Sequence, residues 1–338
     1  MALRDAAAAS VIAFGRFRQT RIARRSTMTQ RPRLRALLIA AAVALVGGIA
    51  PAARAEDPAP APAWRTFFDV DGKPLPFKTD AELLEFLRTA EPISETHLSG
   101  GINFPRKVVL EKDGIKADAV FRDVNEDKDK PTFGGGRNEI GFTDSYIYEP
   151  AAYELGLMLG LDNVPPATLR KLHYKSGSIQ IFIEHAKDEK KLIEEHIELP
   201  KDQMWMKQVQ MMNFFDALIY NVDRNRGNIL ITKDWRLWMI DHTRTFRKLP
   251  TLQEPVTIHQ CERGVYQKLK ALDEKEVRER MKPYLSSFEI DGLIARRKLL
   301  LDLIDKLIAE KGEDQVLYDF TFVPAAPAAA PAATKPGA

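Results

Sequence analysis

The sequence predicts an α+β fold with two lobes, a strand-rich lobe over about residues 64–185 and a helical lobe over about 186–323. Two observations support this prediction. Before His185, short β-branched and aromatic runs alternate with turn residues such as Asp113 and Gly114, which is typical of hairpins. After His185, most apolar residues recur at helical spacing. Strands followed by helices indicate an α+β arrangement rather than alternating βα units.

Each lobe is built from short predicted elements. In the first lobe we expect a helix over 81–89, strands over 108–110 and 117–122, a charged, glycine-rich loop over 125–141, a helix over 145–161, and strands over 167–172 and 178–183. In the second lobe we expect helices over 190–196 and 201–221, a hairpin of strands 229–232 and 235–240, and helices over 265–284 and 288–309.

Charge is unevenly distributed along the chain. Of its 50 Lys and Arg and 47 Asp and Glu, residues 1–55 hold ten Arg and one acid, so the remainder carries a net charge of −6. This mildly acidic body argues against nucleic acid as the partner. The single cysteine, Cys261, excludes an internal disulfide framework and a Cys-based zinc cluster, and we expect it to be an ordinary packed residue.

Residues 28–55 have the pattern of a secretory signal peptide. Three Arg precede an apolar run over 36–50, and Ala53-Arg54-Ala55 offers a small-x-small cleavage site. The run is shorter than the ~20 residues of a membrane span, so no stable span is expected after cleavage, although an uncleaved anchor is the alternative. The sequence therefore predicts export to the periplasm or beyond, and residues 1–27 are interpreted as a mis-assigned upstream start.

Two Pro/Ala segments flank the predicted domain. Residues 56–63 (EDPAPAPA) form a linker, and residues 324–338 form a similar tail that we expect to be disordered. Neither segment has the apolar residues needed for a core. The folded domain is therefore predicted over residues 64–323.

The main candidate functional residues lie in the segment 215–246 (FDALIYNVDRNRGNILITKDWRLWMIDHTRTF). Asp223 and Asn228 are separated by four residues at the end of a predicted helix, and Asp241 follows after a predicted hairpin. The hairpin brings Asn228 and Asp241 to adjacent strand ends, where both could bind one ion. Carboxylate and amide oxygens suit Mg²⁺, which also keeps waters and phosphate oxygens. Turn chemistry alone could explain each motif separately, but their order and spacing favour a site.

The block resembles the atypical kinase superfamily that includes phosphatidylinositol 3- and 4-kinases, HipA-type kinases, spore-coat CotH kinases and the secreted Golgi casein-kinase family. The similarity rests on the Asp223–Asn228 spacing and on IDH at 240–242, and it extends upstream to EPAAYEL at 149–155 and VPP at 164–166. The resemblance implies a two-lobed protein-kinase-like fold that uses ATP with Mg²⁺ or Mn²⁺. Asp223 would then act on the acceptor hydroxyl, and Asn228 and Asp241 would hold the metal.

The same resemblance assigns further nucleotide-binding positions. Glu149 would pair with the cation that binds phosphate, although it could instead favour a helix N-terminus. Backbone groups near Glu184 and His185 would meet adenine, and Gly100-Gly101 would cover the phosphates. Gly134-Gly135-Gly136 is interpreted as flexible linker, and His242 is expected to support Asp241.

One position departs from the resemblance. Where those families carry a lysine after A-x-F, this chain has Arg122, which keeps the charge and can form bidentate contacts with phosphate or with Glu149. Lys116 is the nearest substitute, but it lies close to the turn. Phosphate binding is therefore expected, whereas Arg122 puts the geometry of transfer in question.

The sequence thus supports a Mg-ATP-dependent phosphotransferase acting on a protein, sugar or lipid-headgroup hydroxyl outside the cytoplasm. A nucleotide-binding pseudokinase that acts through a partner is the alternative, because of Arg122 and because ATP is scarce outside the cytoplasm. A non-catalytic protein of the cell envelope is a third reading, against which the presence of Asp223, Asn228 and Asp241 together speaks.

Overall fold

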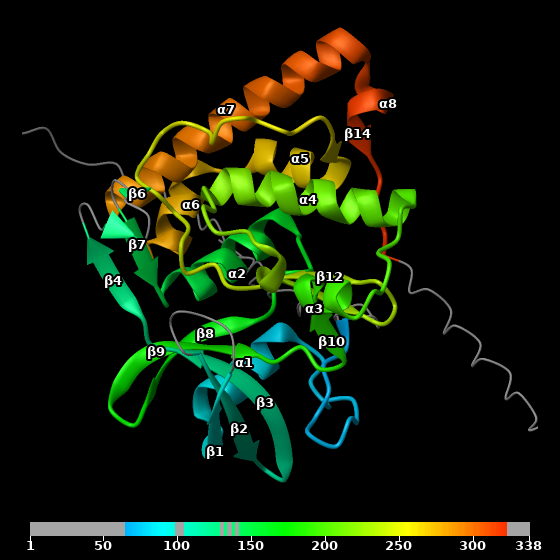
Figure 1. Cartoon of the computed structure of the whole chain (residues 1–338). Helices are drawn as coiled ribbons and strands as arrows, with labels where there is room; N and C mark the ends of the chain where they lie inside the picture. The colour runs from blue at the N-terminus through cyan, green and yellow to red at the C-terminus, as the bar shows by residue number, and fades with distance from the viewer. Residues whose placement is uncertain (1–64, 99–104, 129–131, 134–136, 139–141, 323–338) are drawn as a thin grey trace, which may run out of the picture. The chain divides into compact units, whose positions relative to one another are not determined.

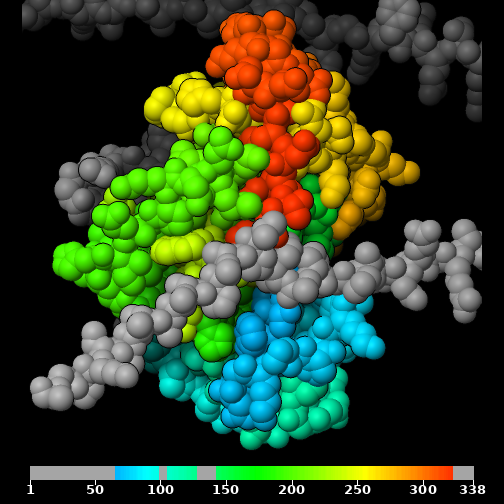
Figure 2. Space-filling view, turned by 90° about the vertical axis from the view of Figure 1, so that its right-hand side faces the viewer, coloured from blue at the N-terminus to red at the C-terminus, as the bar shows by residue number. Residues whose placement is uncertain are grey.

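The computed structural model describes residues 65–98, 105–128, 132–133, 137–138 and 142–322. The predicted signal peptide, both Pro/Ala segments, Gly100-Gly101 and Gly134-Gly135-Gly136 lie outside the described residues. The described chain has a strand-rich N-terminal part and a helical C-terminal part, as the sequence predicts (Figure 1). In Figure 2 the blue N-terminal residues lie on the strand-rich part and the red C-terminal residues on the helical part.

An antiparallel five-stranded sheet forms the strand-rich lobe. In spatial order its strands are β1 (Glu91–His97), β2 (Arg106–Lys112), β3 (Ile115–Arg122), β9 (Lys175–Ile181) and β8 (Ala167–Leu172). Alternate residues of β3, such as Ala119 and Phe121, are fully buried in a core shared with helix α1 (Asp80–Thr89). Because side chains alternate across a strand, Asp118, Val120 and Arg122 point to the other face of the sheet.

Helix α1 begins at a capping box. The Thr79 hydroxyl accepts a hydrogen bond from the backbone N–H of Glu82, whose carboxylate accepts one from the N–H of Thr79. This pairing satisfies N–H groups that a helix start leaves open. The apolar face of the helix, with Leu83, Phe86 and Leu87, then packs against the sheet.

The helical lobe surrounds a second, larger apolar core. Helix α2 (Tyr148–Leu159) lies between the lobes and contributes to this core. The further helices are α3 (Glu189–Glu194), α4 (Gln203–Ile219), the 3₁₀ turn η2 (Arg226–Asn228), α5 (Arg263–Ala271), α6 (Glu274–Met281), α7 (Ser287–Lys311) and α8 (Glu313–Val316). The sheet β10 (Ala186–Asp188), β11 (Ile229–Thr232) and β12 (Leu237–Met239) and the parallel pair β13 (Cys261–Glu262) and β14 (Leu317–Tyr318) complete it.

Three local predictions were wrong. The segment expected as a loop over 125–141 begins with β4 (Asn125–Lys128), which pairs with β7 (Phe142–Ser145), and it also holds the short pair β5 (Thr132–Phe133) and β6 (Arg137–Asn138). The helix predicted from residue 145 starts only at Tyr148, because β7 uses residues up to Ser145. The helix expected over 265–284 is divided, because Asp273 accepts hydrogen bonds from the N–H groups of Lys275 and Glu276 and starts α6. The strand β1 was not predicted at all.

Within the described ranges, no helix combines the length and the apolar character needed to cross a bilayer. Cys261 is 1% exposed, and burial raises the pKa of its thiol, as expected for a packed residue.

Candidate active site

The loop after α4 is closed by its own side chains. The helix ends at Tyr220, whose backbone is left-handed (φ 54°), and Asn221 Oδ1 then accepts a hydrogen bond of 2.9 Å from the N–H of Asp223. Asn228 Nδ2 donates to the carbonyl of Asp223 over 2.8 Å. Asn225 caps the intervening η2 turn by accepting from the N–H of Gly227. The five-residue spacing of Asp223 and Asn228 therefore produces a hydrogen-bonded ring.

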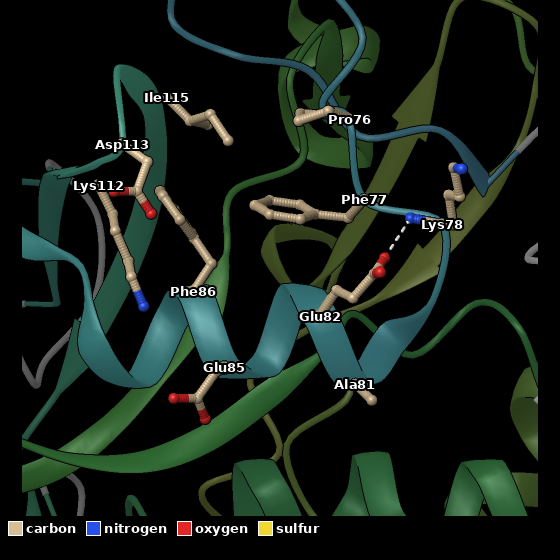
Figure 3. A pocket seen from close by; sticks show the side chains of 10 residues that line it. All are labelled: Pro76, Phe77, Lys78, Ala81, Glu82, Glu85, Phe86, Lys112, Asp113 and Ile115. Atoms are coloured by element: carbon tan, nitrogen blue, oxygen red, sulfur yellow. Dashed lines mark hydrogen bonds between the residues drawn. The ribbon is translucent and has the colours of Figure 1, made fainter.

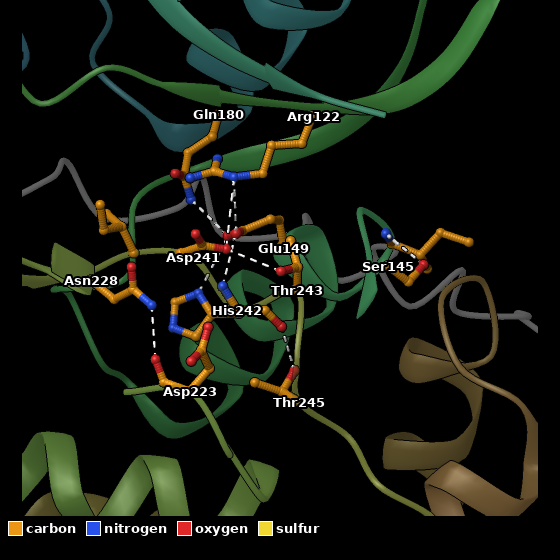
Figure 4. A network of polar contacts seen from close by, with 12 residues as sticks. Arg122, Ser145, Glu149, Gln180, Asp223, Asn228, Asp241, His242, Thr243 and Thr245 are labelled. Atoms are coloured by element: carbon orange, nitrogen blue, oxygen red, sulfur yellow. Dashed lines mark hydrogen bonds and ion pairs between the residues drawn. The ribbon is translucent and has the colours of Figure 1, made fainter. Parts of the chain in front are cut away.

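Asp241 comes to this loop through the β11–β12 hairpin. The N–H of Ile240 donates to the carbonyl of Asn228 over 3.2 Å, so the two segments lie side by side. Asp241 has φ 58°, and its Oδ1 accepts a hydrogen bond of 3.1 Å from the Thr243 hydroxyl. Figure 4 shows Asp223, Asn228 and Asp241 gathered on one side of Arg122 and Glu149. The structure thus brings together the three residues that the sequence singled out.

Arg224 fastens this arrangement, and sequence reasoning missed it. Its Nε and Nη2 donate to the two carboxylate oxygens of Asp216, over 2.8 and 2.9 Å. Its Nη1 donates to the carbonyls of Asn228 (2.6 Å) and Ile240 (2.8 Å). One guanidinium therefore fixes the backbone at Asn228 and next to Asp241, against a carboxylate held in α4. The available signal was Asp216 itself, a single acid inside the apolar run FFDALI.

Arg122 and Glu149 form the opposite wall of the site. Arg122 ends β3, 7% exposed, and its Nε lies 3.6 Å from Oε1 of Glu149 and 3.9 Å from Oδ1 of Asp241. Within the described chain, Nη1 of Arg122 is buried without a hydrogen-bond partner. A buried guanidinium that has an unpaired donor and lies next to Asp241 is suited to bind an anionic group. Lys116, the substitute considered from the sequence, instead pairs with Glu111 near the turn.

Glu149 is completely buried yet held as an anion. Burial alone would raise the pKa of its carboxyl, but Arg122 and hydrogen bonds from His242 lower it to about 2. Gln180 on β9 also donates to its Oε2 over 3.1 Å, a contact that sequence reasoning missed. Glu149 does not cap α2, because the N-cap residue is Ile147 and has no side-chain hydrogen bond.

His242 lies differently from the expectation. Its backbone N–H donates to Oε1 of Glu149 over 2.8 Å, and its ring contacts Glu149 and Arg224 over 3.3 Å each. It is 0% exposed. His242 is therefore held between Glu149 and Arg224. No hydrogen bond in the described chain joins its ring to the carboxylate of Asp241.

Asp223 is the most exposed of the acids Asp223, Asp241 and Glu149. Its side chain is 39% exposed, and its Oδ1 lies 3.4 Å from Nη1 of Arg244. Partial burial raises the pKa of this carboxyl, the charges of Asp241 and Asp144 act in the same direction, and Arg244 opposes them. A carboxylate with a raised pKa and access to solvent is suited to accept a proton from a bound hydroxyl.

Glu184 and His185 follow β9 at the edge of the same sheet face. Lys107 Nζ lies 2.6 Å from Asp118 and 4.0 Å from Glu184, and burial together with a hydrogen bond to Asp118 raises the pKa of Glu184 to about 7. His185 is exposed, and its ring meets Phe68 edge-on with ring centres 5.2 Å apart.

These two residues also line a cavity of about 440 Å³ with aromatic side chains that include Phe67 and Trp238. In the described ranges no hydrogen bond or ion pair joins Glu184 or His185 to Arg122 or Asp241. The structure therefore places Glu184 and His185 at this cavity, without such a contact to Arg122 or Asp241.

A larger cavity of about 620 Å³ lies away from these residues (Figure 3). It is formed by α1 and the turn between β2 and β3, with Phe77, Phe86 and Ile115 among its lining residues. Ile115 starts β3 and Arg122 ends it, so this cavity and the site are at opposite ends of the strand. Volume alone does not identify the functional site here.

The side-chain oxygens of Asn228 and Asp241 fit a metal ion whose coordination is completed by water and a bound ligand. The described residues contain no group of three or more His, Cys, Asp and Glu arranged around one ion. Because Nδ2 of Asn228 donates to Asp223, its Oδ1 is left for another partner, and Asp241 is one-third exposed beside it. Two such donors suit Mg²⁺, which keeps several waters and binds phosphate oxygens at phosphoryl-transfer sites.

Solved structures with a similar fold include a Fam20 protein from hydra and the Golgi casein kinase. "The structure of hydra Fam20 with sugar" matches with a TM-score of 0.56 and 16% identity over 72% of this chain and 94% of that one. A Golgi casein kinase matches with a TM-score of 0.51 and 15% identity over 70% and 78% of the two chains. The Golgi casein kinase with Mn/ADP bound gives 0.51 and 16% over 72% and 80%.

No family model and no curated protein matches the sequence. At these identities the structural matches concern the fold, and that fold is kinase-like, as the sequence resemblance implies.

Proposed function

We propose that the chain is a Mg-ATP-dependent phosphotransferase that acts on a hydroxyl acceptor outside the cytoplasm. The observation that carries the proposal is the closed loop of Asp223 and Asn228 with Asp241 placed beside it by Arg224. The kinase-like fold and the Mn/ADP bound to one neighbour support it. The predicted signal peptide over 28–55 supports the location.

Each residue has a chemical role in this proposal. Asn228 and Asp241 would hold the metal, which neutralises phosphate charge when it is bound. Arg122 would direct its open Nη1 to a phosphate oxygen, while Glu149 keeps the guanidinium in place. Asp223 would orient the acceptor hydroxyl and take its proton, while the hydroxyl oxygen bonds to the γ-phosphorus of ATP and ADP leaves. Binding in this geometry supplies most of the rate through positioning. The acceptor would be a protein, a sugar or a lipid headgroup.

A pseudokinase is the second candidate, and one observation favours it. Arg122 ion-pairs with both Glu149 and Asp241, so the guanidinium competes with a cation for Asp241. Such competition is expected in a chain that binds nucleotide without transferring phosphate. The two candidates therefore differ in transfer, while they agree on nucleotide binding.

Phosphoryl transfer can be tested with the purified chain, γ-labelled ATP and Mg²⁺ or Mn²⁺. We expect label in one of three acceptor pools: proteins, oligosaccharides or lipid headgroups. The Asp223→Asn variant should bind ATP like wild type and lose transfer, whereas Asp302→Asn, at an exposed position of α7, should keep both. Binding without transfer in every pool would favour the pseudokinase, and absence of binding would reject both candidates.

A further inference from the structure

His242 is the buried residue at which the two walls of the site meet. Its ring lies between Glu149 on α2 and Arg224 in the loop after α4, 3.3 Å from each. Glu149 holds Arg122 on the phosphate side. Arg224 holds the carbonyls of Asn228 and Ile240 on the metal side. A continuous chain of polar contacts therefore runs through this imidazole, as Figure 4 shows in part.

The partners of the ring define its hydrogen position. An arginine can only donate, so Nε2 of His242 must accept from Nη2 of Arg224. The hydrogen of a neutral ring then sits on Nδ1 and is donated to Oε2 of Glu149. If the hydrogen were on Nε2, it would face an N–H of Arg224, so two donors would meet without an acceptor.

The direct ion pair between Arg122 and Asp241 is longer than either ring contact of this relay. Nε of Arg122 lies 3.9 Å from Oδ1 of Asp241, whose side chain is 33% exposed. A cation beside Asp241 would compete for the same carboxylate, so this ion pair would loosen when metal binds. The contacts of His242 involve no metal-type oxygen and would persist. The relay thus remains when the site is filled, together with the hydrogen bond from the backbone N–H of His242 to Oε1 of Glu149, which substitutions of the ring leave in place.

We propose that His242, as the Nδ1–H tautomer, is a positioning residue that couples phosphate binding at Arg122 to metal binding at Asn228 and Asp241. The proposal rests on the proposed function, because it concerns nucleotide and metal at the same site. Coupling between two sites is reciprocal and typically changes affinity by about 5- to 150-fold. His242 would therefore contribute to how strongly Mg²⁺ tightens ATP binding.

Two substitutions separate the two contacts of the ring. In His242→Asn the amide can replace Nδ1 and donate to Glu149, but it does not reach Arg224. In His242→Gln the longer side chain can replace Nε2 and accept from Arg224, but it loses the donation to Glu149. If the relay needs both contacts, both variants lose coupling, although each keeps one hydrogen bond. Exposed His259 offers the control pair His259→Asn and His259→Gln.

The coupling is measured as the ratio of the ATP dissociation constants without and with Mg²⁺, using the full chain. We expect both His242 variants to reduce this ratio at least about fivefold, the lower end of common couplings, and both His259 variants to keep it. A wild-type ratio in either His242 variant would overturn the proposal, because the relay would then not need that contact.

The tautomer can be tested without nucleotide. Long-range ¹H–¹⁵N spectra of ¹⁵N-histidine-labelled chain distinguish the two neutral tautomers. Substituting the five other histidines in turn, all of them exposed, identifies the His242 resonance by elimination. We expect the Nδ1–H form in wild type. An Nε2–H form or an imidazolium would overturn the relay even if the variants fail to fold. Absence of ATP binding in wild type together with the Nδ1–H form would instead reject the proposed function and its coupling, and leave the contact geometry standing.

Discussion

Nε of Arg122 lies 3.6 Å from Oε1 of Glu149, so the last residue of β3 and the second residue of α2 meet in the site. Glu149 is completely buried, and Arg122 is nearly so. The pair gives the phosphate side of the proposed site a fixed cation whose Nη1 is open within the described chain.

Removing this cation should weaken ATP binding. We expect Arg122→Ala to lose a charge-assisted contact of about 1.5–3 kcal/mol, or roughly ten- to a hundredfold in affinity. Arg122→Lys should keep much of the binding, because the charge and the approximate reach remain. Titration of ATP into the three proteins measures this effect. An unchanged dissociation constant for Arg122→Ala would remove Arg122 from the site.

The Asp216–Arg224 pair should stabilise the fold as well as the site. Both side chains are only 10% exposed, so Asp216→Ala leaves a buried guanidinium without its carboxylate. Breaking such a pair costs about 3–5 kcal/mol of unfolding free energy. The exposed pair of Lys306 and Glu310 on α7 is the control, and Glu310→Ala should cost at most about 0.5 kcal/mol. Urea unfolding compares the two, and equal losses would contradict this account.

Gly177 on β9 should not tolerate a side chain. A Cβ at this position would collide with the ring of Phe121 and the carbonyl of Arg122. We expect Gly177→Ala to destabilise the chain by about 1–3 kcal/mol, the range of overpacking, and to weaken ATP binding because Arg122 must move. The neighbouring exposed Ser176→Ala should change neither quantity. Thermal unfolding and ATP titration test both parts. A Gly177→Ala protein that unfolds like wild type would show that the sheet has room here.

Glu184 should make stability depend on pH. Burial and Asp118 raise its pKa from 4.5 to about 7 in the folded chain, so the folded state binds the proton more tightly than the unfolded state. The favourable contribution is present below pH 4.5 and is lost as pH rises through 7. Glu184→Gln, which cannot ionise, should therefore raise the melting temperature relative to wild type above pH 7 and leave it unchanged near pH 4. A difference that is constant from pH 4 to 8 would mean that Glu184 does not titrate in this way.

The parts of the site that depend on local sequence could be predicted, and the parts that depend on tertiary contacts could not. Asp223, Asn228 and Asp241 are connected by one short loop and one hairpin, so their spacing in sequence sets their spacing in space. Arg224 acts through a carboxylate in α4 and two backbone carbonyls. The lone acid Asp216 in an apolar run indicates that it needs a partner, but nothing in the local sequence indicates that the partner is Arg224 or that Arg224 also reaches the two carbonyls. The direction of the His242 ring likewise depends on α2, which lies about ninety residues earlier in the chain.

The fold shows the same division. The hairpin at Asp113-Gly114 and the apolar faces of α1 and α4 are local patterns, and the structure has them close to the predicted ranges. The strand β4 reads as a charged loop, because its pairing with β7 involves residues more than ten positions away. The break before α6 was missed because Asp273 was not recognised as a helix cap inside a helical pattern.

The most direct test of the proposed function is metal-dependent ATP binding at Asp241. Mg-ATP should raise the melting temperature of wild type, because a ligand that binds only the folded state stabilises it. Asp241→Ala should abolish the shift, and Asp302→Ala, which removes an exposed acid of α7, should keep it. An equal shift in wild type and Asp241→Ala would contradict the account, since Asp241 would then not be a ligand of the metal.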